Sequence, residues 1–143
     1  MRTTGSILVA VIIGSAIVWG QTASPQPGPG AAAVARGEQL FGTHCATCHG
    51  EHARGNGPLA DQLCTRPPDL TTFTARNGGI FPSERVYRII DGRGIRSHGD
   101  REMPIWGDAF KTSRDGLAAD AVKQRIDALV SYLEAIQKRA AEH

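Results

Sequence analysis

The chain has 143 residues, 41% of them hydrophobic and 21% charged, which suits one small globular domain with extensions. Its 16 basic and 14 acidic residues give a formal charge of +2, and no basic stretch is interleaved with aromatic residues, so the sequence excludes a nucleic-acid-binding protein. Aromatic residues make up only 6% of the chain, which predicts that its side chains alone build a small core.

The N-terminal segment has the pattern of an export signal. Arg2 precedes an apolar run over residues 7–19, and a positive charge followed by roughly 7–15 apolar residues is typical of a secretory signal peptide. The run is shorter than the ~20 residues of a transmembrane helix. We expect residues 1–23 to form a signal peptide or, if they are not cleaved, a short membrane anchor. A buried helix of the folded domain is the third interpretation.

A change of composition marks the start of the folded domain. Residues 24–33 are rich in proline, glycine and alanine, a composition typical of a linker that buries no core. We therefore expect one domain over residues 34–143.

Three helices are predicted inside this domain. A short helix over residues 34–41 leads into the next motif, and a second spans residues 83–91, with Ser83 as its N-cap and Gly92 at its C-terminal cap. Apolar residues that recur with helical period predict the third helix over residues 122–136. No segment shows the alternation of a β-strand, so the predicted fold class is all-α.

The segment Cys45-Ala46-Thr47-Cys48-His49 carries the strongest chemical signal. Two cysteines three residues apart, followed directly by histidine, form the arrangement of covalent haem attachment. On a helical turn these three residues share a face. Both thiols can then react with the vinyl groups of one porphyrin, and the imidazole can bind its iron.

Other uses of the two cysteines are a zinc site, a thioredoxin-like redox pair and a structural disulfide. Zinc would draw its ligands from Cys45, Cys48, His49 and His52, which are more crowded than the separated pairs of structural zinc sites. A redox pair is expected near a βαβ pattern, which the sequence does not show. The third cysteine, Cys64, is expected to be a small buried apolar residue, with intermolecular pairing as the alternative.

Met103 is the expected second ligand of the haem iron. It precedes Pro104, which restricts Met103 to an extended backbone and suits a loop that carries one side chain inward. A methionine that fills a gap in the core is the alternative. The remaining histidines are alternative ligands: His44, His52, His98 and His143. Of these, only His98 lies far enough from the haem turn and from the chain end to reach the iron.

Five motifs follow one another between residues 34 and 137: Ala35-x-Gly37-x-x-Leu40-Phe41, Cys45-Ala46-Thr47-Cys48-His49-Gly50, Gly55-Asn56-Gly57-Pro58, Met103-Pro104-x-Trp106-Gly107 and Ile126-x-x-Leu129-Val130-x-Tyr132-Leu133. In this order they resemble the monohaem class I cytochromes c. The resemblance implies N- and C-terminal helices that cross and pack, with Gly37 and Tyr132 at the crossing, and one covalently bound haem c.

The resemblance also implies that the carbonyl of Pro58 accepts the imidazole N–H of His49, which would fix the orientation of that ligand. We further expect the haem propionates to bond to some of Arg85, Arg93, Arg96 and Trp106, because buried carboxylates require charged or N–H donors. The pocket is expected to be lined by Leu63, Leu70 and Phe73.

The expected function is one-electron transfer in the periplasm, by a protein that is free or tethered through residues 7–19 and is not itself an enzyme. His49 and Met103 would together leave no open coordination site. The expected partners are a redox donor and acceptor such as an oxidase, a reductase or a dehydrogenase. One alternative is a cytochrome c subunit of an oxidoreductase complex, and another is a gas-binding or catalytic haem.

Overall fold

The structure is a computed structural model, and it describes residues 29–93, 103–111 and 119–138. The predicted signal segment, His98, Arg96 and His143 lie outside the described residues. Within the described ranges the chain forms six α-helices and two 3₁₀ turns with no strand, which confirms the all-α prediction. No described helix has the length and apolar character needed to cross a membrane.

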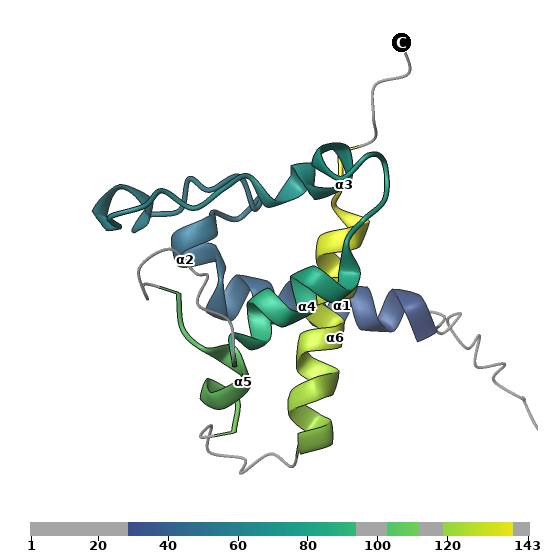
Figure 1. Cartoon of the computed structure of the whole chain (residues 1–143). Coiled ribbons are helices and arrows are strands. Elements are labelled where there is room, and N and C mark those ends of the chain that lie inside the picture. The colour runs from purple at the N-terminus through teal and green to yellow at the C-terminus, as the bar shows by residue number, and fades with distance from the viewer. Residues whose placement is uncertain (1–28, 94–102, 112–118, 139–143) are drawn as a thin grey trace, which may run out of the picture.

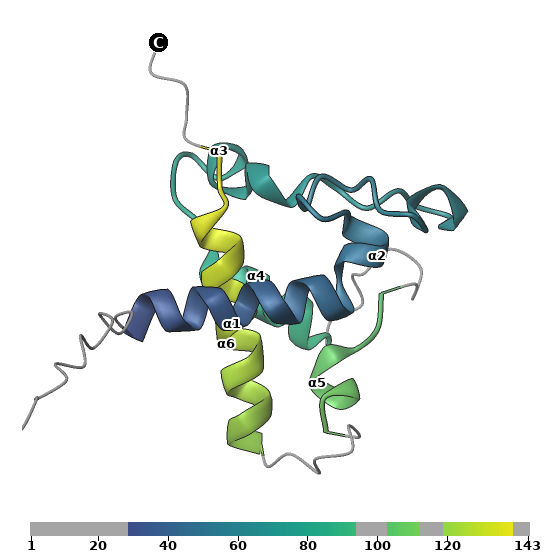
Figure 2. The same ribbon diagram turned by 180° about the vertical axis from the view of Figure 1, so that it is seen from behind.

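Two helices from opposite ends of the domain cross and form its largest packing contact (Figures 1 and 2). They are α1 (Pro29–His44) and α6 (Ala119–Ala135). At the crossing, a Cβ atom on Gly37 would overlap the carbonyl oxygen of Ala128 and lie 2.7 Å from the Cβ atom of Tyr132. Glycine therefore lets the two backbones approach, as the resemblance implied for Gly37 and Tyr132.

Apolar side chains on the inner faces of these helices build the core. Five of them are at most 4% exposed: Phe41, Val122, Ile126, Leu129 and Leu133. The helix α4 (Ser83–Asp91) packs against α6 and adds two more buried side chains, Val86 and Ile90. Because the apolar stripe of α6 faces both partners, α6 joins α1 to α4.

The first helix is longer than predicted. The structure places Pro29–Ala33 inside α1, whereas the sequence composition predicted a linker over residues 24–33, so the linker prediction is wrong over its second half. Proline is well tolerated in the first turn of a helix, where its missing N–H would have no partner. The alanines that follow have the highest helix propensity. This propensity outweighs the content of proline and glycine, which is typical of a flexible linker.

The helix over residues 83–91 has the predicted bounds, and its C-terminal cap Gly92 takes the left-handed conformation, with its N–H bonded to the carbonyl of Arg88 at 2.9 Å. The N-terminal cap differs from the prediction. Ser83 is the first residue of the helix, Pro82 occupies the cap position, and no side-chain cap bond forms. The last helix, α6, begins three residues before its predicted start at residue 122.

Four short elements were not predicted: the 3₁₀ turns Ala60–Gln62 and Leu70–Thr72, and the helices α3 (Phe73–Arg76) and α5 (Trp106–Ala109). Each spans only three or four residues, and hydrophobic periodicity needs a longer window to be recognised. Three of these four elements each contribute one residue to the site described below: Leu70, Phe73 and Trp106.

The crossing of α1 and α6 predicts opposite effects for two glycines of α1. Gly37→Ala should reduce the free energy of unfolding by about 1–3 kcal/mol, because the new methyl group overpacks the crossing. Gly42→Ala should raise it by about 0.5–1 kcal/mol, because Gly42 is exposed and a Cβ atom there would have no neighbour within 4 Å. Urea unfolding of both variants measures the two effects. Equal effects would contradict the close approach at Gly37.

Candidate functional site

The helix α2 (Ala46–His49) follows α1 after the single residue Cys45, and it brings the two thiols and the imidazole to one side. The N–H groups of Cys48 and His49 donate to the carbonyl of Cys45 at 3.2 and 2.9 Å. This tight turn places Cys45, Cys48 and His49 on the wall of one cavity of about 270 Å³. The geometry expected from the spacing is therefore present.

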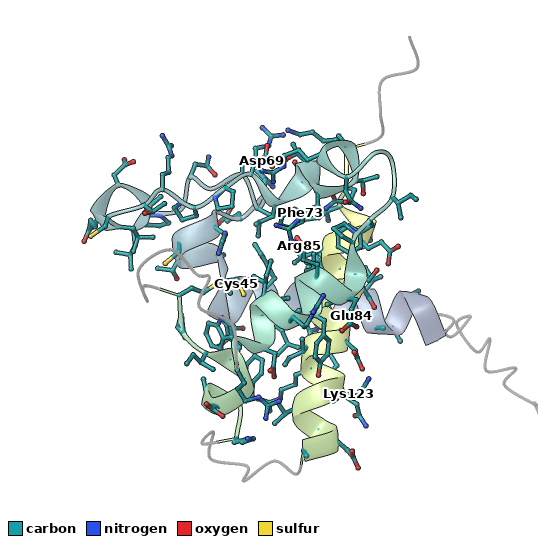
Figure 3. The ribbon with its side chains drawn as sticks, in the orientation of Figure 1. Cys45, Asp69, Phe73, Glu84, Arg85 and Lys123 are labelled. Carbon is teal, nitrogen blue, oxygen red and sulfur yellow. The ribbon has the colours of Figure 1, made fainter. Side chains whose placement is uncertain are left out.

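Met103 lines the same cavity as His49, although the two residues are far apart in the sequence. A smaller cavity of about 40 Å³ reaches into the core, and Met103, His49 and Cys45 line it as well. Most of the other side chains on both walls are apolar, including the expected Leu70 and Phe73. The structure thus places one imidazole, one thioether and two thiols on the wall of one largely apolar cavity, from His49, Met103, Cys45 and Cys48. Figure 3 labels two of the lining residues, Cys45 near α2 and Phe73 near α3.

Two glycines hold one wall of this cavity against the cysteine turn. A Cβ atom on Gly57 would lie 2.6 Å from the carbonyl oxygen of Ala46, and one on Gly55 would overlap the carbonyl oxygen of Pro67. The N–H of Leu70 donates to the carbonyl of Ala53 at 2.8 Å. The Gly55–Gly57 loop therefore packs between α2 and the extended segment that carries Pro67 and Leu70.

Pro58 is exposed and is not among the cavity residues. The N–H of Leu59 donates to the carbonyl of Thr47 at 3.0 Å, and this bond joins the loop to the cysteine turn. The bond expected from the carbonyl of Pro58 to His49 does not require Pro58 to line the cavity, and it stays a prediction. Pro67 and Pro68 line the cavity, and the sequence analysis did not expect them there.

Trp106 lines the cavity in contact with two other rings. Its ring centre lies 5.3 Å from those of His44 and Phe110. Its indole N–H is buried and has no hydrogen-bond partner among the described residues. A buried donor without a partner is costly, so this N–H suits a cavity that receives a polar group from a ligand.

His44 is a cavity residue that the sequence analysis considered only as an iron ligand. Burial, followed by the positive charge of Arg125, lowers the pKa of its imidazole. His44 therefore stays neutral near pH 7, as the apolar character of the cavity requires.

The thiols do not resemble those of a redox-active pair. Burial, followed by the neighbouring Cys48, raises the pKa of Cys45 to about 12, whereas redox cysteines have lowered pKa values. No disulfide joins the three cysteines of the chain. Cys64 is exposed, so the prediction of a buried residue is wrong. Its two neighbours, Leu63 and Thr65, line the cavity, and Cys64 does not.

The loop that carries Met103 packs closely on the end of α4. A Cβ atom on Gly92 would lie 3.2 Å from the Cα atom of Ile105. Gly107 is buried, and a Cβ atom there would lie 2.8 Å from the carbonyl oxygen of Asp91. These contacts on both sides of Trp106 fix the backbone that places Met103 at the cavity.

The residues that follow α6 bond to another part of the wall. Gln137 donates to the carbonyl of Leu70 at 2.9 Å and accepts a bond from the N–H of Thr74 at 3.0 Å. Lys138 forms an ion pair of 2.9 Å with Asp69. The chain just beyond α6 is therefore bonded to the segment that presents Leu70 and Phe73.

The arginines expected near propionates differ in position. Arg85 lines a separate cavity that adjoins the main one. Arg93 forms an ion pair of 2.6 Å with Asp91. Arg96 lies outside the described residues. The described residues contain no group of three or more His, Cys, Asp or Glu side chains that would hold a metal ion.

A family model described as Cytochrome c matches residues 34–137, the same interval that carries the five motifs. Among curated proteins, the Cbb3-type cytochrome c oxidase subunit FixP of Azorhizobium caulinodans is 28% identical over 92 residues, which are 58% of this chain and 31% of that protein. This chain thus matches about a third of the length of that relative. No solved structure matches the chain.

The bonds at the end of α6 predict a pH-dependent contribution to stability. Hydrogen bonds from Thr71 and Lys138 lower the pKa of Asp69 from its ordinary 3.8 to about 2. A carboxyl group whose pKa is lower in the folded than in the unfolded chain stabilises the fold at pH values above its unfolded pKa. This stabilisation is lost as the pH falls from about 4 to 2. Asp69→Asn should therefore cost about 1 kcal/mol at pH 7, after allowance for solvent screening.

Urea unfolding at several pH values measures this difference, which should shrink towards zero below about pH 3. Glu84→Gln is the matched control, because the pair of Glu84 with Arg88 is 3.7 Å long and exposed and should contribute almost nothing. An Asp69→Asn effect that stays constant from pH 7 to about pH 2 would show that the carboxylate charge is not the cause.

Proposed function

The chain belongs to the cytochrome c family, and from this premise we propose that it is an exported carrier of single electrons that uses one haem c with His49 and Met103 as iron ligands. Members of the family bind haem c covalently. The observation that carries the proposal is the cavity in which Cys45, Cys48, His49 and Met103 meet.

The residues present are suited to the group. Cys45 and Cys48 would form the two thioether bonds, and the tight turn between them keeps both sulfur atoms on one side. The walls are mostly apolar, as a porphyrin requires, and the buried N–H of Trp106 offers one donor to its periphery. When bound, the haem iron supplies the one-electron chemistry.

The protein would contribute position, exclusion of water and a closed coordination sphere. An imidazole and a thioether together leave no site for a substrate or a gas, and a thioether ligand raises the reduction potential. The contacts of Gly92 and Gly107 would hold the Met103 loop in place. This arrangement favours electron transfer over catalysis at the iron.

The place of action and the partners follow from the same proposal. Residues 1–23 would direct export to the periplasm, either as a cleaved signal or as a tether. The nearly balanced charge of +2 favours no strongly charged partner. We therefore expect small, transient contacts with a redox donor and an acceptor.

The similarity to an oxidase subunit favours a second candidate function. FixP is named as a subunit of a cbb3-type cytochrome c oxidase, and this chain would in that case transfer electrons inside a stable oxidoreductase complex. Affinity purification from membranes under mild detergent separates the two candidates. A partner retained in constant ratio through gel filtration indicates a subunit, and a chain that elutes alone indicates a free carrier.

Mass spectrometry of the exported protein tests haem attachment directly. We expect a mass increase of one haem, and an N-terminus near residue 21 or 24 if the signal is cleaved. The double variant Cys45→Ser/Cys48→Ser should lose the covalent haem. Cys64→Ser is the matched control and should keep it, because Cys64 is exposed and is not among the cavity residues. Absence of covalent haem from the unmodified protein would contradict the proposed function.

Met103→Ala tests the second iron ligand. We expect the ferric absorption spectrum to lose the features of methionine ligation, the potential to fall, and the ferrous protein to bind carbon monoxide rapidly. Ile105→Ala in the same loop is the control, because Ile105 is 49% exposed and should leave the spectrum unchanged. If the spectrum of Met103→Ala matches that of the parent protein, another residue binds the iron.

A further inference from the structure

The loop that carries Met103 runs directly into a pair of packed aromatic rings. The helix α5 begins at Trp106 and packs on α4 and α6. The ring centres of Trp106 and Phe110 lie 5.3 Å apart, and the N–H of Phe110 donates to the carbonyl of Trp106 at 3.0 Å. The two rings are therefore held together on the turn that follows Met103.

His44 adds a third ring to this pair from another part of the chain. It is the last residue of α1, and it directly precedes Cys45. Its imidazole centre lies 5.3 Å from the centre of the Trp106 ring and 5.4 Å from that of the Phe110 ring. Rings at this separation attract each other in tilted and edge-to-face arrangements, and the planes here are inclined by 55° and 69°. Each of the three rings thus contacts the other two.

The imidazole of His44 connects the two segments that carry the proposed iron ligands. On one side, α1 continues through Cys45 into α2, which ends at His49. On the other side, Met103 leads into α5. Figures 1 and 2 show α5 beside the end of α1 that leads into α2. Movement of the Met103 loop away from α2 would therefore separate His44 from its two ring partners.

The group of rings also contacts α6. Phe110 is 2% exposed, and the guanidinium carbon of Arg125 lies 5.4 Å from the centre of its ring. A cation placed over an aromatic face is attracted to it. Side chains from α1, α5 and α6 thus form one cluster, and the first and last of these helices are fixed against each other at their crossing. The cluster is therefore suited to restrain the short helix α5.

Resting on the proposed iron ligands, we propose that His44 is a positioning residue that keeps Met103 at the iron by holding its loop through the Trp106 and Phe110 rings. His44 itself would bind neither the iron nor a redox partner. Without its ring, the loop would leave the cavity more often, and the position of Met103 would be open in a larger fraction of molecules. His44 would thus act from the cysteine turn, whereas Gly92 and Gly107 position the same loop from α4.

An ordinary packing role for His44 is the competing explanation. In that case, loss of the ring would lower the stability of the whole domain, and Met103 would be released only as a consequence of that loss. Local opening of a loop and global unfolding are separate equilibria, and they can be measured separately. A variant that is destabilised elsewhere in the core therefore distinguishes the two roles.

The test is the rate at which the ferrous holoprotein binds carbon monoxide, which under the proposal follows the fraction of molecules with Met103 released. His44→Ala removes two ring contacts and should raise this rate about tenfold. His44→Phe retains a ring and should stay within about twofold of the parent protein. His44→Gln keeps a polar side chain without a ring. It should raise the rate as well, and it replaces His44→Ala if that variant does not fold.

Val130→Ala is the matched control. Val130 is a buried core residue of α6 and is not among the residues of either cavity that Met103 lines. Its truncation should lower the stability to urea and leave the rate of carbon monoxide binding unchanged. Mass spectra of every variant report separately on covalent haem.

Two results would overturn the inference. One is a parent rate in both His44→Ala and His44→Gln. The other is a rate in Val130→Ala that rises as much as in His44→Ala at an equal loss of stability, because His44 would then have only a packing role. A parent protein that lacks haem, or that itself binds carbon monoxide rapidly, would instead reject the proposed iron ligands on which the inference rests.

Discussion

The close crossing of α1 and α6 is the contact on which the rest of the structure depends. Gly37 allows the two backbones to meet at Ala128, so both helices are fixed relative to each other at one point. From this point α1 leads directly into Cys45 and α2, while the chain just beyond α6 is bonded through Gln137 to the cavity wall at Leu70. One packing contact thus sets the distance between two walls of the site.

Glycines have the same role around the cavity itself. Gly57 lies against the carbonyl groups of the cysteine turn, Gly55 lies against Pro67, and Gly107 lies against the end of α4. At each position a side chain would push a wall segment outward. The cavity is therefore defined by close backbone contacts as well as by its apolar lining, and these contacts would hold a large, rigid cofactor without strand pairing in the described residues.

The parts that were predicted well have a strong local signal. The helix over residues 83–91 and the core positions of α6 follow from apolar periodicity, and the cysteine turn follows from a spacing that fits one helical face. The parts that were missed have only a weak local signal. Three-residue and four-residue helices are too short for a period, and no local pattern marks Pro67 and Pro68 as residues that line the cavity.

The sequence by itself determined the helical class, the cysteine turn and the candidates for the iron ligands, because these depend on residue type and on spacing within a few positions. Tertiary structure alone decided that Met103 reaches the cavity of His49 and that Pro67 and Pro68 line its wall. It also brought the ring of His44 against those of Trp106 and Phe110. Such juxtapositions depend on how distant segments pack, and no local pattern encodes the close contacts that produce them.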